Sequence, residues 1–130
     1  MPATITVTLL GAAKEAQFSR EGTYILQPND ANGNKYWLQG SNAIWYDEKC
    51  LNWNIGSIGD GTSSRSSAAL CSNFSSNSGP LEATTWNYIS GGIWIEATDL
   101  IILSTRNKNL EWFRFDVVSY ARYTHSCICR

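Results

Sequence analysis

Aromatic side chains next to amides and carboxylates are the residues of this chain best suited to binding chemistry. Five of the six tryptophans fall between residues 36 and 95, in short aromatic runs. The face of an aromatic ring can stack on a sugar, and Asn or Asp beside it can hydrogen-bond the hydroxyl groups. This chemistry predicts a ligand-binding site formed by Tyr36, Tyr46, Trp53 and Trp94, with Asn42, Asp47 and Asn54 as polar partners.

The same rings also have a structural interpretation. In a half-buried strand, successive residues point to opposite faces, so one ring of each adjacent aromatic pair belongs to the core. Tryptophan is highly buried on average in folded proteins. The predicted platform therefore requires Tyr36, Tyr46 and Trp53, or Trp94 near a glycine turn, to lie on the solvent side of their strands.

The residues that commonly carry catalysis show no recognisable arrangement. The only histidine, His125, precedes Cys127 by two positions, and a thiolate–imidazole pair is disfavoured because the cysteines are better explained as disulfides. No carboxylate spacing selects an acid–base pair. Residues 56–61 lack the ending of a phosphate loop, and Asp30, Asn32 and Asn34 fit an Asn-Gly turn better than a calcium loop. We therefore predict a protein that is not an enzyme and uses no cofactor or metal.

An even number of cysteines, in a chain rich in Ser, Thr, Asn and Gly, favours an oxidising compartment. Cys50, Cys71, Cys127 and Cys129 allow three disulfide connectivities. Pairing Cys50 with Cys71 leaves a tight bridge between Cys127 and Cys129, whereas either crossed pairing staples the C-terminal residues to the domain. The Cys-x-Cys pair has no partner motif that would make a zinc site. We predict disulfides and a secreted, extracellular protein.

The length and charge of the chain limit the domain count and the classes of partner. With 130 residues the chain is one domain that can bury its own core. A net charge of −1, with 16% charged residues, offers no electrostatic footprint for nucleic acid or an anionic membrane. No apolar run approaches the ~20 residues of a membrane-spanning helix. Residues 4–10 alternate like a strand and do not resemble a signal peptide.

Short β-branched and aromatic runs between turn residues predict an all-β fold, a small antiparallel β-sandwich or barrel with short strands. Residues 12–21 are expected to form a short helical turn, and residues 90–92 a glycine hairpin turn. A long Ser/Gly-rich loop spans residues 56–79, with one short strand around residues 68–70. The other strands are expected at residues 4–10, 23–27, 35–38, 43–46, 52–55, 84–89, 93–96 and 99–103. Residues 1–103 then form the β-module and residues 104–130 a C-terminal extension, docked on the same domain or on a neighbour.

The aromatic and glycine runs resemble a recurrent β-module of secreted or surface proteins from invertebrates and protists. The runs that carry the resemblance are Gly22-Thr23-Tyr24, Asn34-Lys35-Tyr36-Trp37, Ala43-Ile44-Trp45-Tyr46, Trp53-Asn54-Ile55-Gly56, Trp86-Asn87-Tyr88 and Gly92-Ile93-Trp94. The resemblance covers residues 4–103 and implies a small adhesion or recognition unit, with no catalytic residues to transfer.

Two functions are therefore expected. The first is a secreted, lectin-like module that binds glycans by aromatic stacking and gains avidity as a homo-oligomer or through tandem copies. The alternative is a structural or adhesive matrix protein whose aromatic residues are all core and whose contacts are protein–protein. Exposed aromatics beside Asn or Asp in a concave groove favour the lectin, and either a flat apolar patch or a sheet edge paired between copies favours the matrix protein.

Overall fold

Nine short strands and one α-helix form the part of the chain that the computed structural model describes, residues 1–31, 33–58 and 67–105. The strands are β1 (Thr4–Leu9), β2 (Gly22–Leu26), β3 (Trp37–Gln39), β4 (Asn42–Asp47), β5 (Asn52–Ser57), β6 (Ser67–Ser72), β7 (Trp86–Ser90), β8 (Ile93–Glu96) and β9 (Ile101–Ser104). The helix α1 (Gly11–Gln17) and the 3-10 turns η1 (Phe18–Arg20), η2 (Pro80–Glu82) and η3 (Thr98–Leu100) connect them. The predicted all-β fold is confirmed.

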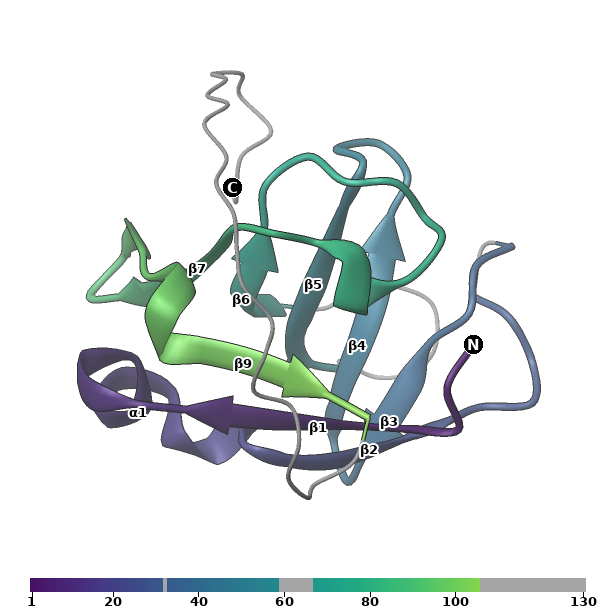
Figure 1. Ribbon diagram of the computed structural model, residues 1–130, viewed down its shortest axis with the longest axis horizontal. Helices are drawn as coiled ribbons and strands as arrows, with labels where there is room; N and C mark the ends of the chain where they lie inside the picture. Colours follow the sequence, from purple (N-terminus) through teal and green to yellow (C-terminus); the bar gives the residue numbers. More distant parts are fainter. Residues whose placement is uncertain (32, 59–66, 106–130) are drawn as a thin grey trace.

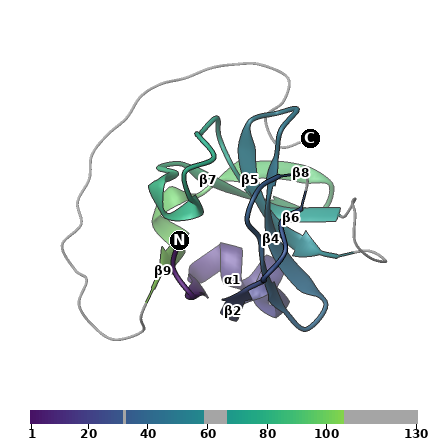
Figure 2. The same ribbon diagram turned by 90° about the vertical axis from the view of Figure 1, so that its right-hand side faces the viewer.

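All nine strands belong to one antiparallel sheet, in the order β8-β7-β6-β5-β4-β3-β2-β1-β9 (Figure 1). From β1 to β8, strands that are consecutive in the chain pair with each other, and β9 alone returns across the molecule to pair with β1. The sheet curls into a half-barrel, as Figures 1 and 2 show from two sides. Strand twist accumulates over nine strands and favours this curling over a flat sheet.

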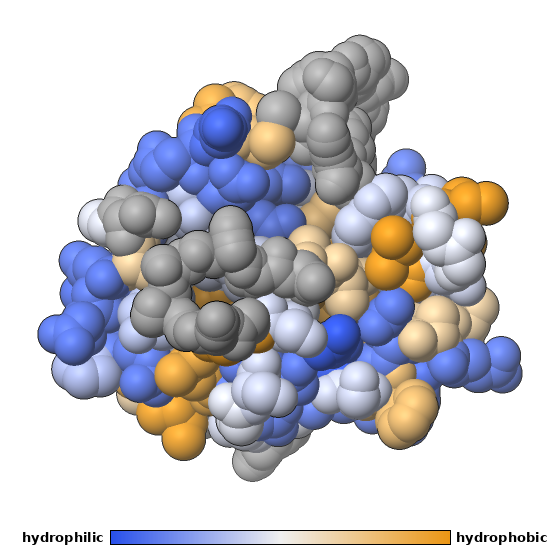
Figure 3. Space-filling view, turned by 180° about the vertical axis from the view of Figure 1, so that it is seen from behind, coloured by the Kyte–Doolittle hydropathy of each residue, from blue (hydrophilic) through white to orange (hydrophobic). Residues whose placement is uncertain are grey.

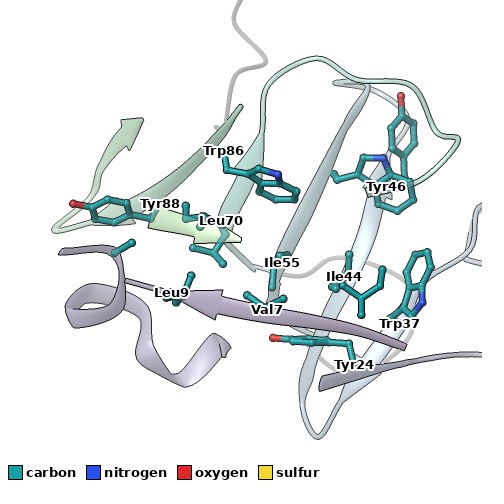
Figure 4. Packing of buried hydrophobic residues seen from close by; sticks show 14 residues of the cluster. Val7, Leu9, Tyr24, Trp37, Ile44, Tyr46, Ile55, Leu70, Trp86 and Tyr88 are labelled. Carbon is teal, nitrogen blue, oxygen red and sulfur yellow. The ribbon is translucent and has the colours of Figure 1, made fainter. Parts of the chain in front are cut away.

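The concave side of the half-barrel holds the hydrophobic core. Inward-pointing residues from strands β1 to β7 and from β9 meet there in one cluster, part of which Figure 4 shows from close by. α1 packs on the same side, since Ala13 is buried and Ala16 is packed against the cluster. The helix contacts β7 and η3, and Gln17 Nε2 donates a 2.8 Å hydrogen bond to the carbonyl of Ile89 in β7. These contacts bind the first strands of the chain to the last ones.

The hairpin between β7 and β8 has a two-residue turn, as its sequence predicts. Gly91 and Gly92 have φ angles of 59° and 81°, so both occupy the left-handed region, which is typical of a type I′ turn. A type I′ turn matches the twist of the two strands that it joins. The glycines therefore fix the register in which Ser90 lies opposite Ile93.

The segment expected to be a long loop contains more strand than its composition indicates. β5 continues to Ser57, and β6 spans residues 67–72, where a short strand around residues 68–70 was expected. A register irregularity between Ile55 and Gly56 accompanies the pairing of β5 with β6. Most of the predicted extension, residues 106–130, lies outside the described residues, as do Asn32 and residues 59–66.

Candidate functional site

Three aromatic rings from β3, β4 and β5 form a buried cluster at one end of the core. The ring centroids of Trp37 and Trp53 are 5.9 Å apart, and those of Tyr46 and Trp53 are 5.0 Å apart. Both pairs meet edge to face, an arrangement that aromatic quadrupoles favour. Trp37 and Trp53 are completely buried, and Tyr46 is 5% exposed. We call these residues the aromatic trio.

Each member of the aromatic trio directs its polar atom to a backbone carbonyl. Trp37 Nε1 donates to Pro2 at 2.9 Å, Tyr46 Oη donates to Ser75 at 2.7 Å, and Trp53 Nε1 donates to Ser76 at 3.0 Å. A buried N–H or O–H without an acceptor is destabilising, so these bonds are needed to bury the rings. They also hold the start of the chain and the segment after β6 against the rim of the half-barrel.

The predicted stacking platform is wrong for Tyr46 and Trp53. Tyr46 points to the same side of β4 as the core residue Ile44, and Trp53 to the same side of β5 as Ile55. Because side chains alternate in direction along a strand, both rings point into the core, and neither presents a face to a ligand. The outward ring of β4 is that of Trp45, which is half-buried.

The three predicted polar partners have structural contacts. Asn42 Oδ1 accepts a hydrogen bond from Arg20 at 2.5 Å, and its Nδ2 donates to the carbonyl of Ser19 at 2.9 Å. Asp47 Oδ1 accepts from the backbone N–H groups of Lys49 and Cys50 at 2.9 and 3.3 Å, an Asx-type turn between β4 and β5.

Asn54 is the third polar partner, and it is only 6% exposed. Its Nδ2 lies 3.4 Å from the carbonyl oxygen of Asn52 and 3.3 Å from the Oδ1 of that residue. The structure does not bring Asn42, Asp47 and Asn54 together around one exposed ring.

Two predicted rings remain partly accessible. Tyr36 is half-buried just before β3, where its carbonyl accepts a 3.0 Å hydrogen bond from the N–H of Gln27. Trp94 is half-buried in β8 and lies opposite Ile89. Both rings remain candidates for ligand contact, at separate places on the sheet.

β8 is an edge strand with an apolar surface, and this is the feature that the sequence analysis missed. Ile93 is 64% exposed and Ile95 is 39% exposed, whereas Ile44 in β4 and Ile55 in β5 are completely buried. The run Ile93-Trp94-Ile95 carries no lysine or proline, the residues that commonly protect an edge. Alternation after the Gly-Gly turn predicted the strand, but nothing local indicated that it would be the last of the sheet.

The backbone of β8 also exposes hydrogen-bonding groups. In a two-residue hairpin the pair that flanks the turn, Ser90 and Ile93, exchanges hydrogen bonds, and the next pair, Ile89 and Trp94, does not. The N–H and C=O of Trp94 therefore point away from β7. Within residues 1–31, 33–58 and 67–105, β8 has no strand on this side.

The outward face of the same half of the sheet carries a second distinctive set of side chains. Five residues lie opposite one another in register across β4 to β8, and we call them the outward row: Trp45, Asn54, Cys71, Asn87 and Glu96. Cys71 is completely buried and Asn87 is 7% exposed. Asn87 Nδ2 donates to the carbonyl of Cys71 at 3.1 Å and to Asn73 Oδ1 at 2.9 Å.

The face seen from behind in Figure 3 shows hydrophobic patches separated by hydrophilic residues. No three His, Cys, Asp or Glu side chains gather to hold a metal ion anywhere in the described ranges. Among the helices of those ranges, none has the length and apolar character needed to cross a membrane.

Two tyrosines have altered acidity because of their surroundings. Burial raises the pKa of Tyr24 above its ordinary value, although the nearby Arg20 guanidinium acts in the opposite direction. Burial also raises the pKa of Tyr46, and the carboxylates of Glu48 and Asp47 raise it further. Both hydroxyl groups donate to backbone carbonyls, Tyr24 to Arg20 at 2.7 Å and Tyr46 to Ser75. Both tyrosine side chains therefore act as uncharged hydrogen-bond donors in the structure.

Comparisons with known proteins identify no relative of this chain. No protein-family model matches the chain, and neither a curated protein nor a solved structure matches it. The resemblance to an extracellular β-module remains a prediction that these comparisons do not test.

Proposed function

We propose that this protein is a non-catalytic extracellular adhesion module that joins to a second copy of itself through edge strand β8. The observation that carries the proposal is the exposure of Ile93 and Ile95 on a strand whose outer hydrogen-bonding groups face away from the sheet. Apolar side chains and unpaired backbone groups on one edge are the two requirements for strand addition.

A two-fold symmetric pairing of β8 with β8 suits this edge. When a two-fold axis relates two β8 strands, the strands pair antiparallel. Residues that lie opposite each other then have their side chains on the same side of the joined sheet. An axis through Trp94 sets the two Trp94 residues opposite each other, and the outward-pointing N–H and C=O of each can then bond to the other. Ile93 of one copy lies opposite Ile95 of the second copy, so apolar side chains meet twice across the interface.

The charge and size of this edge agree with weak self-association. The net charge of −1 opposes the approach of two copies very little. Because β8 has only four residues, a single contact is weak, and useful adhesion requires several copies on one surface or in one chain. This is the protein–protein alternative foreseen from the sequence, and the burial of the aromatic trio favours it over a Tyr46–Trp53 sugar platform.

Sedimentation velocity over a wide concentration range tests the proposal. We expect a reversible monomer–dimer equilibrium that the double variant Ile93→Lys/Ile95→Lys abolishes, because two cations per copy would oppose each other across the axis. Ile25→Lys is the matched control: Ile25 is 56% exposed, but β2 lies between β1 and β3. A wild-type protein that remains monomeric at millimolar concentration, or a dimer that survives the double substitution, would contradict the proposal.

Glycan binding remains a second candidate at Trp94. The supporting observation is a half-buried indole with Glu96 exposed two residues further along the same face of β8. A ring and a carboxylate so placed could contact a sugar face and its hydroxyl groups. A multivalent glycan array should then give a coherent set of hits that Trp94→Ala removes and Trp53→Phe retains. A blank array from folded protein would exclude this candidate.

A further inference from the structure

The outward row and the residues that flank it on the same strands form a surface on the convex side of the sheet. This surface carries little charge. The core cluster and α1 lie on the opposite side of these strands. Residues two positions along the same strands point the same way. The flanking residues at one end of the row are apolar or small: Ala43, Gly56, Ala69, Ile89 and Trp94. At the other end, Asp47 and Asn52 lie opposite each other in β4 and β5. Of these twelve residues only Asp47 and Glu96 carry a charge, whereas solvent-facing strand positions are ordinarily polar.

Cys71 lies at the centre of this face. It stands opposite Asn54 in β5 and Asn87 in β7, and it is completely buried. The register also separates Cys71 from Cys50. Cys50 lies in the turn before β5, four residues from Asn54, which corresponds to about 10 Å or more along the strand. Disulfides require Cα atoms within about 7 Å, so the register is incompatible with a Cys50–Cys71 bridge.

Residues 106–130 have the composition to cover such a face. This segment has five Lys or Arg and two Asp or Glu, a net charge of +3. Residues 1–105 have five cations and nine carboxylates, a net charge of −4, and the two values add to the −1 of the whole chain. The segment also contains a concentration of large apolar residues: Leu110, Trp112, Phe113, Phe115, Val117 and Val118. Opposite charge and matching apolar character make these residues a suitable occupant of the face.

The length of the chain after β9 is sufficient to reach Cys71. β9 is six strand positions away from β6 in the sheet order, which is about 29 Å at ~4.8 Å per strand. Twenty-one residues separate Thr105 from Cys127, and in extended form they reach roughly 70 Å. This segment is therefore long enough to curve around the half-barrel and reach Cys71.

We propose that residues 106–130 pack across the outward row and that a disulfide joins Cys71 to Cys127 or Cys129. The bond forms between two Sγ atoms, and the two thiols release two protons and two electrons. A small-molecule disulfide such as oxidised glutathione accepts them and is reduced to two thiols. The cross-link closes a loop of more than 50 residues, which is the kind that restricts the unfolded chain strongly. This assignment is independent of self-association through β8.

The positions of Lys and Arg allow a direct test by peptide mapping. Trypsin cleavage after Lys49, Arg65, Arg106 and Arg122 places Cys50 in peptide 50–65, Cys71 in peptide 66–106, and both Cys127 and Cys129 in peptide 123–130. The full chain, folded in a glutathione redox buffer and alkylated, is digested without reduction and analysed by mass spectrometry. We expect peptide 66–106 linked to peptide 123–130, in protein that runs as a monomer on a non-reducing gel.

Two variants and a protease assay complete the test. The link should persist in Cys50→Ser and disappear in Cys71→Ser. Reduction of the folded protein should accelerate native-state tryptic cleavage after Arg114 by about tenfold or more, because the segment loses its anchor. Four free thiols, a link from peptide 50–65 to peptide 66–106, or a link between two chains would overturn the disulfide. Equal cleavage rates before and after reduction would overturn the packing.

Discussion

The indole rings of Trp37 and Trp53 meet edge to face, with centroids 5.9 Å apart and ring planes inclined at 63°. The two residues come from β3 and β5 and lie on either side of β4. Their contact therefore bridges one strand of the curled sheet and helps to fix its curvature on the concave side. Removal of either ring should act on folding and not on ligand recognition.

Trp53→Ala is expected to destabilise the fold by about 3–5 kcal/mol, the usual range for truncating a large buried aromatic residue. The substitution removes the contacts with Trp37 and Tyr46 and leaves the carbonyl of Ser76 without its 3.0 Å donor. Trp53→Phe keeps an aromatic ring and should destabilise less. Urea unfolding followed by circular dichroism measures both. A Trp53→Ala protein with wild-type stability would contradict the assignment of this ring to the core.

The two buried tyrosines predict an alkaline unfolding transition. Burial disfavours the tyrosinate anion, so the folded-state pKa of Tyr24 and of Tyr46 lies above the unfolded value of about 10. The folded state consequently binds these protons more tightly. The stability that they contribute is complete below pH ~10 and is lost as the pH rises towards the folded-state values.

Absorbance at 295 nm, which follows tyrosinate, and far-ultraviolet circular dichroism measure this transition together. We expect part of the tyrosine ionisation to coincide with unfolding, and we expect Tyr24→Phe to remove part of that coincident signal. If all tyrosines ionise at ordinary pH values while the protein stays folded, the two hydroxyl groups are accessible and the prediction is wrong.

The hairpin turn gives a prediction that separates backbone conformation from packing. Gly91 has a φ of 59°, and a Cβ added there meets no atom within 4 Å. Gly91→Ala should therefore destabilise by about 1 kcal/mol, from the left-handed conformation alone. Gly91→Asn should be tolerated much better, because Asn-Gly is the preferred type I′ pair. Thermal unfolding of the two variants makes the comparison, and equal melting temperatures would contradict a type I′ turn.

Asn42 was expected to bind a ligand, and its contacts predict a structural role instead. Asn42→Ala removes the acceptor of the Arg20 guanidinium and the donor to Ser19, and we expect a loss of about 1–3 kcal/mol. Asn42→Asp keeps an acceptor for Arg20 and should lose less. Chemical denaturation compares the two variants with the wild type. An alanine variant of unchanged stability that loses binding to a ligand would restore the original interpretation.

Local chemistry determined most of the secondary structure of this protein. β-Branched and aromatic runs between Gly, Asn, Asp and Pro were sufficient to predict nearly every strand, because strand preference and turn preference act within a few residues. The Gly91-Gly92 hairpin is the clearest instance, since its two left-handed residues fix the pairing of β7 with β8. The all-β class follows from these local signals.

The tertiary structure alone decided which face of each strand is inside and which strand is an edge. A shift of one residue in register turns every side chain of a strand to the other face, so the pairs Trp45–Tyr46 and Trp53–Asn54 could be oriented only by packing against the curled core. The return of β9 to β1 across the whole sequence made β8 the opposite edge. Pairings between residues so distant depend on the closure of the entire sheet, and no short stretch of sequence encodes them.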